Sequence, residues 1–174
     1  MHAYLNGQLT AALKPDELLR AEWVARVSAL DLYVHELVAQ QMSEIFGGTR
    51  SPSAGFLKFA VPNDVLLRIR AAGSQSAATS TFDLEVRSRL SIVTYQDPEK
   101  IAAGIRLVSD VELWNQIALQ QGATPSTKDS TAKALKLDLS LIVERRNKIA
   151  HEGDLQPGAP RVPWSISRAD LAHV

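Results

Sequence analysis

The stretch that decides the fold class runs from Pro15 to Gly48 and reads PDELLRAEWVARVSALDLYVHELVAQQMSEIFGG. Its apolar residues recur every three or four positions, which is the spacing of one face of an α-helix. Pro15 suits a first helical turn, Asp16 and Glu17 lie at the positive end of the helix dipole, and Gly47-Gly48 is a stop signal. We therefore predict one long amphipathic helix.

Further segments with helical spacing follow, and several begin with residues that cap helices. The predicted helices run from Asn63 or Asp64 to Arg70, from Ser80 or Thr81 to Gln96, from Asp97-Pro98-Glu99 to Val108, from Asp110 to Gln120 with Gly122 as terminator, from Ala134 to Ala150 with Gly153 as terminator, and over a short final segment capped by Ser167. No stretch of the sequence shows sustained alternation of apolar and polar residues, the pattern of a β-strand. The prediction is an all-α fold in one domain, residues 1–174, with residues 1–14 peripheral.

The composition excludes several function classes. Nineteen basic residues against nineteen acidic ones give a net charge of zero, so contact with nucleic acid must be local rather than carried by bulk charge. The absence of cysteine excludes disulfides, thiolate metal sites and cysteine nucleophiles, and favours a reducing, cytoplasmic compartment. We expect no metal site on the scattered histidines, no secretory leader and no membrane span.

The candidate chemistry lies in ERRNKIAHEGD, residues 144–154, at the end of the predicted helix over residues 134–150. Arg146 and His151 are five residues apart, about 140° around the helix axis and about 7.5 Å along it, so they do not share one narrow face. Asn147 lies four residues before His151 and can orient its imidazole or contact the same ligand, while Glu144 and Lys148 form a surface pair. A guanidinium that holds phosphate oxygens beside an imidazole that moves a proton suits cleavage of RNA, whose 2′-hydroxyl supplies the nucleophile.

A simpler interpretation explains the same residues. Basic side chains at the C-terminal end of a helix are what the helix dipole favours in any case. A second Arg-x4-His pair, Arg168 and His173, has no apolar stripe behind it and shows how readily the bare spacing arises. The residue types alone leave a charged helix end and an active site both open.

Longer stretches carry more information than the spacing. LIVERRNKIAHEGD places Arg146, the polar Asn147 and His151 in an Arg-polar-x3-His pattern, and it is accompanied by ALDLYVHELVAQQM and YQDPEKIAAGIRLVSDVELWNQIA upstream and by a PW-SIS return downstream. Together these stretches resemble the HEPN superfamily, in particular its RiboL-PSP-HEPN branch. The resemblance covers most of residues 20–174.

This resemblance implies a HEPN-like helical bundle with one long N-terminal helix and a long signature helix, paired two-fold as a homodimer. It implies a metal-independent endoribonuclease that needs no cofactor, in a toxin–antitoxin, restriction or antiphage defence setting with an antitoxin or defence-system partner. The alternative within the family is an inactive module that binds RNA, a nucleotide or a protein partner.

The resemblance also assigns roles to residues. It implies Arg146 and His151 as the catalytic pair, with supporting roles for Asn147, Asp31 and His35 and RNA contacts for Arg145 and Lys148. The chain departs from toxin-type relatives in having no tyrosine shortly after His151, and its final helix is short. The tryptophans at 23, 114 and 164 are expected to pack in the core rather than to stack on bases.

Overall fold

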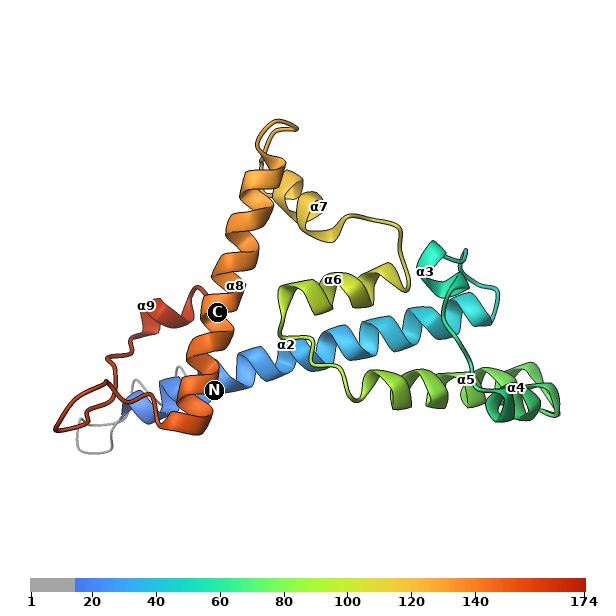
Figure 1. Ribbon diagram of the computed structural model, residues 1–174, viewed down its shortest axis with the longest axis horizontal. Helices are drawn as coiled ribbons and strands as arrows, with labels where there is room; N and C mark the ends of the chain where they lie inside the picture. The colour runs from blue at the N-terminus through green and yellow to red at the C-terminus, as the bar shows by residue number, and fades with distance from the viewer. Residues whose placement is uncertain (1–14) are drawn as a thin grey trace. The chain divides into compact units, whose positions relative to one another are not determined.

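The computed structural model describes residues 15–174, and all of its regular elements within that range are helices (Figure 1). The all-α prediction is confirmed; the predicted peripheral segment 1–14 lies outside the described residues. The helices are α2 (Pro15–Phe46), α3 (Ala54–Leu57), α4 (Asn63–Arg70), α5 (Gln75–Leu90), α6 (Pro98–Arg106), α7 (Leu113–Gln120), α8 (Lys128–Glu152) and α9 (Arg168–Leu171). No helix among these is long and apolar enough to cross a membrane.

The long first helix forms as predicted. It ends at Phe46, and the next turn is closed by the Thr49 N–H, which donates to the Glu44 carbonyl at 3.0 Å. Gly48 takes a φ of 81° there, a conformation that glycine adopts without a steric penalty. Gly47-Gly48 therefore ends the helix as predicted, because glycine can adopt the positive φ that this turn requires.

The chain packs as two compact units. The first contains the described residues up to Leu30 together with Asp138–Val174, and the second contains Asp31–Leu137. Helices α2 and α8 each contribute one part to either unit. The expected single domain stays a prediction, and each unit is described by itself.

The core of the first unit joins the start of α2 to the last part of the chain. Its buried residues are Leu19, Trp23, Val27, Ile166 and Leu171, with Ile142, Val143 and Ile149 of α8 packed against them. The Trp23 indole N–H donates to the Ile142 carbonyl at 3.0 Å. Helix α9 begins with the predicted Ser167 cap, and its buried Leu171 makes this short helix part of the core.

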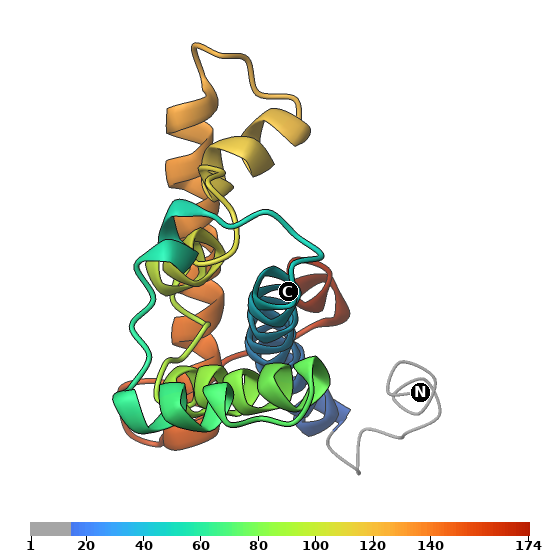
Figure 2. The same ribbon diagram turned by 90° about the vertical axis from the view of Figure 1, so that its right-hand side faces the viewer.

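The second unit is built around the later part of α2. Val38 and Met42 of this helix are fully buried, as is Val86 of α5. The rings of Phe46 and Phe82 stack at a centroid distance of 4.4 Å. Figure 2 shows α4 lying beside α5, and α6 begins with the predicted Asp97 cap, whose carboxylate accepts from two backbone N–H groups.

Three predicted helix starts are wrong. Helix α7 begins at Leu113 rather than at Asp110, and helix α8 begins at Lys128 rather than at Ala134. Helix α5 begins at Gln75, because the Ser74 hydroxyl, rather than that of Ser80 or Thr81, caps it by accepting from the Ala77 N–H at 3.2 Å. The small residues of this segment suggest a loop, yet they are compatible with a helix. Helix α4 begins at Asn63, as predicted, but Pro62 is its N-cap residue and neither Asn63 nor Asp64 caps it with a side chain.

Candidate functional site

Helix α8 ends as the sequence indicates, and the chain then turns back on itself. Gly153 and Asp154 both have a positive φ, 69° and 56° respectively. The Asp154 N–H donates to the Lys148 carbonyl at 3.0 Å, which closes the last turn of the helix. Asp154 is the one described non-glycine residue in this conformation, and its side-chain contacts explain how it is held there.

The Asp154 carboxylate is buried, with its side chain 1% exposed, between two arginines. Its Oδ2 accepts from Arg20 Nε at 3.2 Å and from Arg145 Nη2 at 3.3 Å. These three residues form the Asp154 cluster. A buried carboxylate is stable only when such partners compensate its charge, so this cluster ties the end of α8 to the start of α2.

Sequence reasoning missed Arg20 and Asp154. Arg20 is itself 5% exposed and also donates to the Trp164 carbonyl at 2.6 Å. The available signal was an arginine next to Leu19 on the apolar side of an amphipathic helix. A charge at such a position requires a buried partner, although the sequence does not say which acid supplies it.

Arg145 is surrounded by contacts within its own unit. Its guanidinium lies over the Trp23 ring at 5.0 Å from the centroid, and its Nη2 donates to the Ser165 carbonyl at 2.7 Å as well as to Asp154. These contacts hold the returning chain in place. The RNA contact assigned to Arg145 stays a prediction, and its side chain would have to serve both purposes.

Arg146 is half-buried on the last turns of α8. Its Nη1 donates to the Asn147 side-chain oxygen at 2.9 Å, whereas its Nε is buried and has no hydrogen-bond partner among residues 15–174. Asn147 therefore contacts the arginine; the structure records no bond from it to His151 in the described part of the chain. The arrangement gives Asn147 a role in positioning Arg146 rather than the imidazole.

His151 is exposed, and its imidazole makes no hydrogen bond or ion pair within residues 15–174. It lines a hollow of about 720 Å³ at the end of α8, formed by Lys148, His151, Glu152, Leu155, Gln156, Pro157, Arg161 and Trp164. Arg146 is not among these lining residues. One chain thus presents the histidine, without its predicted partner arginine, to an open space.

Lys148 lines the same hollow and forms the predicted pair with Glu144, with its Nζ 2.7 Å from the Glu144 carboxylate. This hydrogen bond, together with the attraction of the carboxylate, raises the pKa of Lys148. The ammonium group is therefore charged at neutral pH and exposed at the rim of the hollow.

The three tryptophans differ from one another. Trp23 is 6% exposed, as core packing requires, and Trp114 is partly buried with its indole N–H donating to the Pro98 carbonyl at 3.0 Å. For Trp164 the prediction of core packing is wrong: the residue is 46% exposed and lines the hollow beside His151. The prolines around it end the regular pattern, so apolar periodicity gave no information about its burial.

Asp31 and His35 have their recorded contacts inside the second unit. Asp31 accepts from the Tyr95 N–H at 2.5 Å and from the Gln96 side chain at 3.3 Å. The His35 Nε2–H donates to the Val93 carbonyl at 3.1 Å. Both side chains thus hold the segment after α5, and their supporting role at an RNA site stays a prediction.

The second Arg-x4-His pair has a different setting. Arg168 begins the four-residue helix α9, and His173 follows its end. The cap of this helix also involves Asp170, whose pKa is lowered by hydrogen bonds from the backbone and hydroxyl of Ser167. Neither Arg168 nor His173 lines the hollow at the end of α8.

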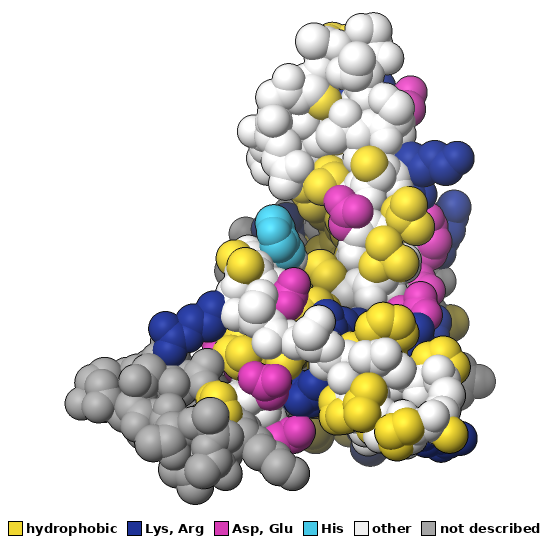
Figure 3. All heavy atoms as spheres, turned by 90° about the vertical axis from the view of Figure 1, so that its left-hand side faces the viewer, with side chains coloured by type: hydrophobic (Ala, Val, Ile, Leu, Met, Phe, Trp, Pro, Cys, Tyr) yellow, Lys and Arg dark blue, Asp and Glu magenta, His cyan; other side chains and the backbone are white. Residues whose placement is uncertain are grey.

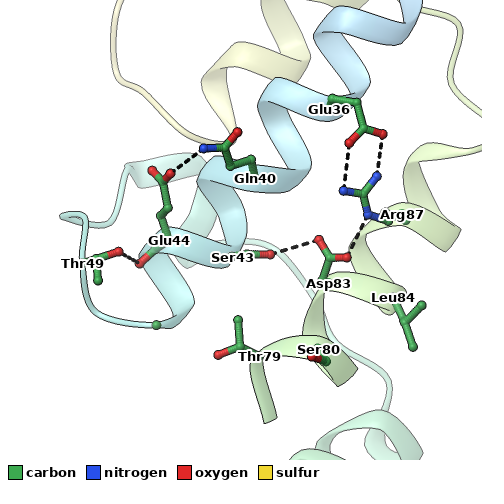
Figure 4. Close-up of a pocket in the computed structure, with 11 residues that line it drawn as sticks. Glu36, Gln40, Ser43, Glu44, Thr49, Thr79, Ser80, Asp83, Leu84 and Arg87 are labelled. Carbon is green, nitrogen blue, oxygen red and sulfur yellow. Dashed lines mark hydrogen bonds and ion pairs between the residues drawn. The ribbon is translucent and has the colours of Figure 1, made fainter. Parts of the chain in front are cut away.

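A second hollow, of about 780 Å³, lies in the second unit against α2 and α5 (Figure 4). Arg87 makes two bonds to the Glu36 carboxylate, at 2.6 and 3.0 Å, and one to Asp83 at 2.8 Å, while the Ser43 hydroxyl donates to Asp83 at 3.1 Å. These four residues form the Arg87 cluster. The arginine is already neutralised by two acids, so this hollow offers little to an anion.

Charged side chains of both signs are mixed on the face of the molecule drawn in Figure 3. The face drawn in Figure 3 carries Lys, Arg, Asp and Glu side chains interspersed with hydrophobic ones, as zero net charge leads one to expect. Within residues 15–174, no three His, Asp or Glu side chains are grouped so as to hold a metal ion.

Comparisons with models of protein families, with curated proteins and with solved structures find no match to this chain.

Proposed function

We propose that this chain is an endoribonuclease of the HEPN type, active as a homodimer, in which Arg146 and His151 carry the reaction. The observation that carries the proposal is the exposed His151 imidazole, five residues after Arg146, in a hollow with Lys148 and Arg161. The resemblance of LIVERRNKIAHEGD and its flanking stretches to the family supports it. The setting in toxin–antitoxin, restriction or antiphage defence is proposed on the same resemblance.

The proposed reaction uses the RNA itself as nucleophile. One imidazole takes the proton of a 2′-hydroxyl, the 2′-oxygen bonds to phosphorus, and the bond from phosphorus to the 5′-oxygen breaks. That oxygen receives a proton from a second imidazole, which leaves a 2′,3′-cyclic phosphate and a 5′-hydroxyl. Arg146 stabilises the negative charge that grows on the phosphate oxygens.

A dimer of two chains can place both catalytic residue types around one phosphate, which a single chain does not do. On a single helix Arg146 and His151 are about 140° apart around the axis, so one phosphate does not reach both. A second α8 that crosses the first brings an arginine and a histidine of each copy around one phosphate. The exposed Leu137 (59%) and Leu141 (54%), four residues apart on α8, offer an apolar contact for such pairing.

The first experiment compares wild type with Arg146→Ala and His151→Ala on a structured RNA in excess EDTA. The expected result is cleavage that survives chelation, leaves cyclic phosphate ends and is lost in both variants. His173→Ala is the matched control, because it removes the histidine of the second Arg-x4-His pair in the same unit and is expected to retain activity. Equal degradation of the RNA by all samples would indicate a contaminating nuclease and would contradict the proposal.

A second experiment mixes the two inactive variants after exchange of subunits. A site shared across the dimer regains part of its activity, because the mixed dimer still holds one intact Arg146 and one intact His151 on opposite chains, and water can replace the second imidazole as the slower proton donor. Light scattering must show dimers in the same samples. A monomer, or RNA binding without cleavage in wild type, would favour the inactive binding module instead.

A further inference from the structure

Trp164 lies in an unusual place for the largest apolar side chain. It is 46% exposed, whereas tryptophans in folded proteins are mostly covered. It lines the hollow at the end of α8 together with His151, Lys148 and Arg161. A flat aromatic surface and three basic groups therefore face the same open space.

The backbone that carries Trp164 is held firmly against the end of α8. Its N–H donates to the Asp154 carbonyl at 2.8 Å, and its carbonyl accepts from Arg20 Nη2 at 2.6 Å. The returning chain is further closed by the Gln156 N–H, which donates to the Val162 carbonyl at 2.9 Å. Because Asp154 and Arg20 are buried, their hydrogen bonds to the Trp164 backbone hold this residue at a fixed position relative to His151.

The charges around Trp164 select the kind of ligand. Lys148, His151 and Arg161 line the hollow with one acid, Glu152, and Lys148 is already paired with Glu144 at 2.7 Å, so Arg161 and His151 are the basic groups left for a ligand. If the ligand were a partner protein with a purely apolar surface, these basic groups would face apolar atoms and lose their hydrogen bonds to water, which costs free energy. A ligand with a flat ring and a phosphate satisfies both the indole and the basic groups, because indoles stack on bases and arginine and lysine bind phosphate oxygens.

We propose that Trp164 is the stacking platform for one unpaired base of an RNA strand, whose adjacent phosphate lies at Arg161 and His151. The inference rests on the proposed function and adds the residue that selects single strands. A base inside a duplex is covered on both faces by its neighbours and does not reach the indole, whereas a base in a loop does. Substrate choice would then follow from base accessibility rather than from base identity.

The test measures binding apart from cleavage. The full chain is titrated with a short, unstructured 2′-O-methyl RNA, which lacks the nucleophile, while indole fluorescence and anisotropy are recorded. Wild type is expected to show quenching of Trp164, and Trp164→Ala to bind roughly 5- to 150-fold more weakly, as the loss of one stacked base predicts. Trp164→Phe keeps an aromatic face and is expected to retain most of the affinity.

The matched control is Tyr33→Ala, which removes another exposed aromatic side chain, 63% exposed and located in the second unit. It should leave the affinity unchanged, and thermal unfolding should show that all variants are folded. A duplex of the same sequence and adenosine monophosphate serve as competitors. Either of them binding as tightly as the single strand would overturn the proposal.

The outcomes separate this inference from the proposed function. Cleavage with undiminished affinity in Trp164→Ala overturns the platform and leaves the nuclease standing. Quenched binding that depends on Trp164, with no cleavage by wild type, supports the platform and overturns the nuclease. A change of oligomeric state in Trp164→Ala at constant RNA affinity would assign the indole to a protein contact and overturn the proposal.

Discussion

The Asp154 cluster and the Arg87 cluster are built from the same groups and differ in their access to water. In the first, Arg20 and Asp154 have side chains 7% and 1% exposed; in the second, Arg87 and Glu36 are 41% and 54% exposed. The exposed pair has the better geometry, with a two-pronged contact at 2.6 and 3.0 Å against a single bond at 3.2 Å. Burial, rather than distance, decides which cluster the fold depends on.

The largest effect is expected for Asp154→Ala. This change leaves the buried Arg20 with the exposed Glu17, 3.1 Å away, as its remaining carboxylate partner among residues 15–174, and breaking a buried pair in this way costs about 3–5 kcal/mol. The free energy of unfolding from urea titration measures it. Asp83→Ala, which removes one of the two acids of the Arg87 cluster, is the matched control; an equal loss in the two variants would end the distinction between the clusters.

An intermediate effect is expected for Asp31→Ala, because the Asp31 side chain is 23% exposed. The change removes the acceptor of the partly buried Tyr95 N–H, and an unsatisfied group of this kind costs about 1–3 kcal/mol. Asp64→Ala, which removes an exposed acid paired with Arg68 on α4, is the control. Urea titration should rank the loss in Asp31→Ala between those of Asp154→Ala and Asp83→Ala.

Sequence patterns predicted the parts of the molecule that local chemistry controls. The long helix, the Asp97 and Ser167 caps and the glycines after α2 and α8 all depend on residues next to one another in the chain. The same holds for the surface pair of Glu144 with Lys148. Each of these features can be predicted from residues within about four positions of one another in the sequence.

The features that sequence patterns missed depend on partners far apart in the chain. Arg20 and Asp154 are 134 positions apart, and their pairing follows from how the first unit packs. The exposure of Trp164 follows from the same cluster, because its backbone bonds to Asp154 and Arg20 while its indole is left in the hollow. Helical spacing carries no information about either.

The smallest effect on stability is expected for Arg87→Ala, at most about 1 kcal/mol, the upper end for exposed ion pairs. Added salt should reduce the difference further, because it screens exposed charges. Urea titrations of wild type and variant at low and high salt measure both effects. A loss as large as that of Asp154→Ala would show that good geometry compensates for exposure, and that burial does not decide between the two clusters.

The same variant has a pH signature with a definite sign. The hydrogen bond from Arg87 lowers the pKa of Glu36, so the stabilising contribution of the pair is complete above the ordinary glutamate pKa. It is lost as the pH falls through the lowered pKa of the folded state. The stability difference between wild type and Arg87→Ala should therefore narrow in acid, and an NMR titration should find the Glu36 pKa higher in the variant. An unchanged Glu36 pKa would mean that the arginine contact does not persist in solution, and the exposed cluster would then contribute even less than its geometry indicates.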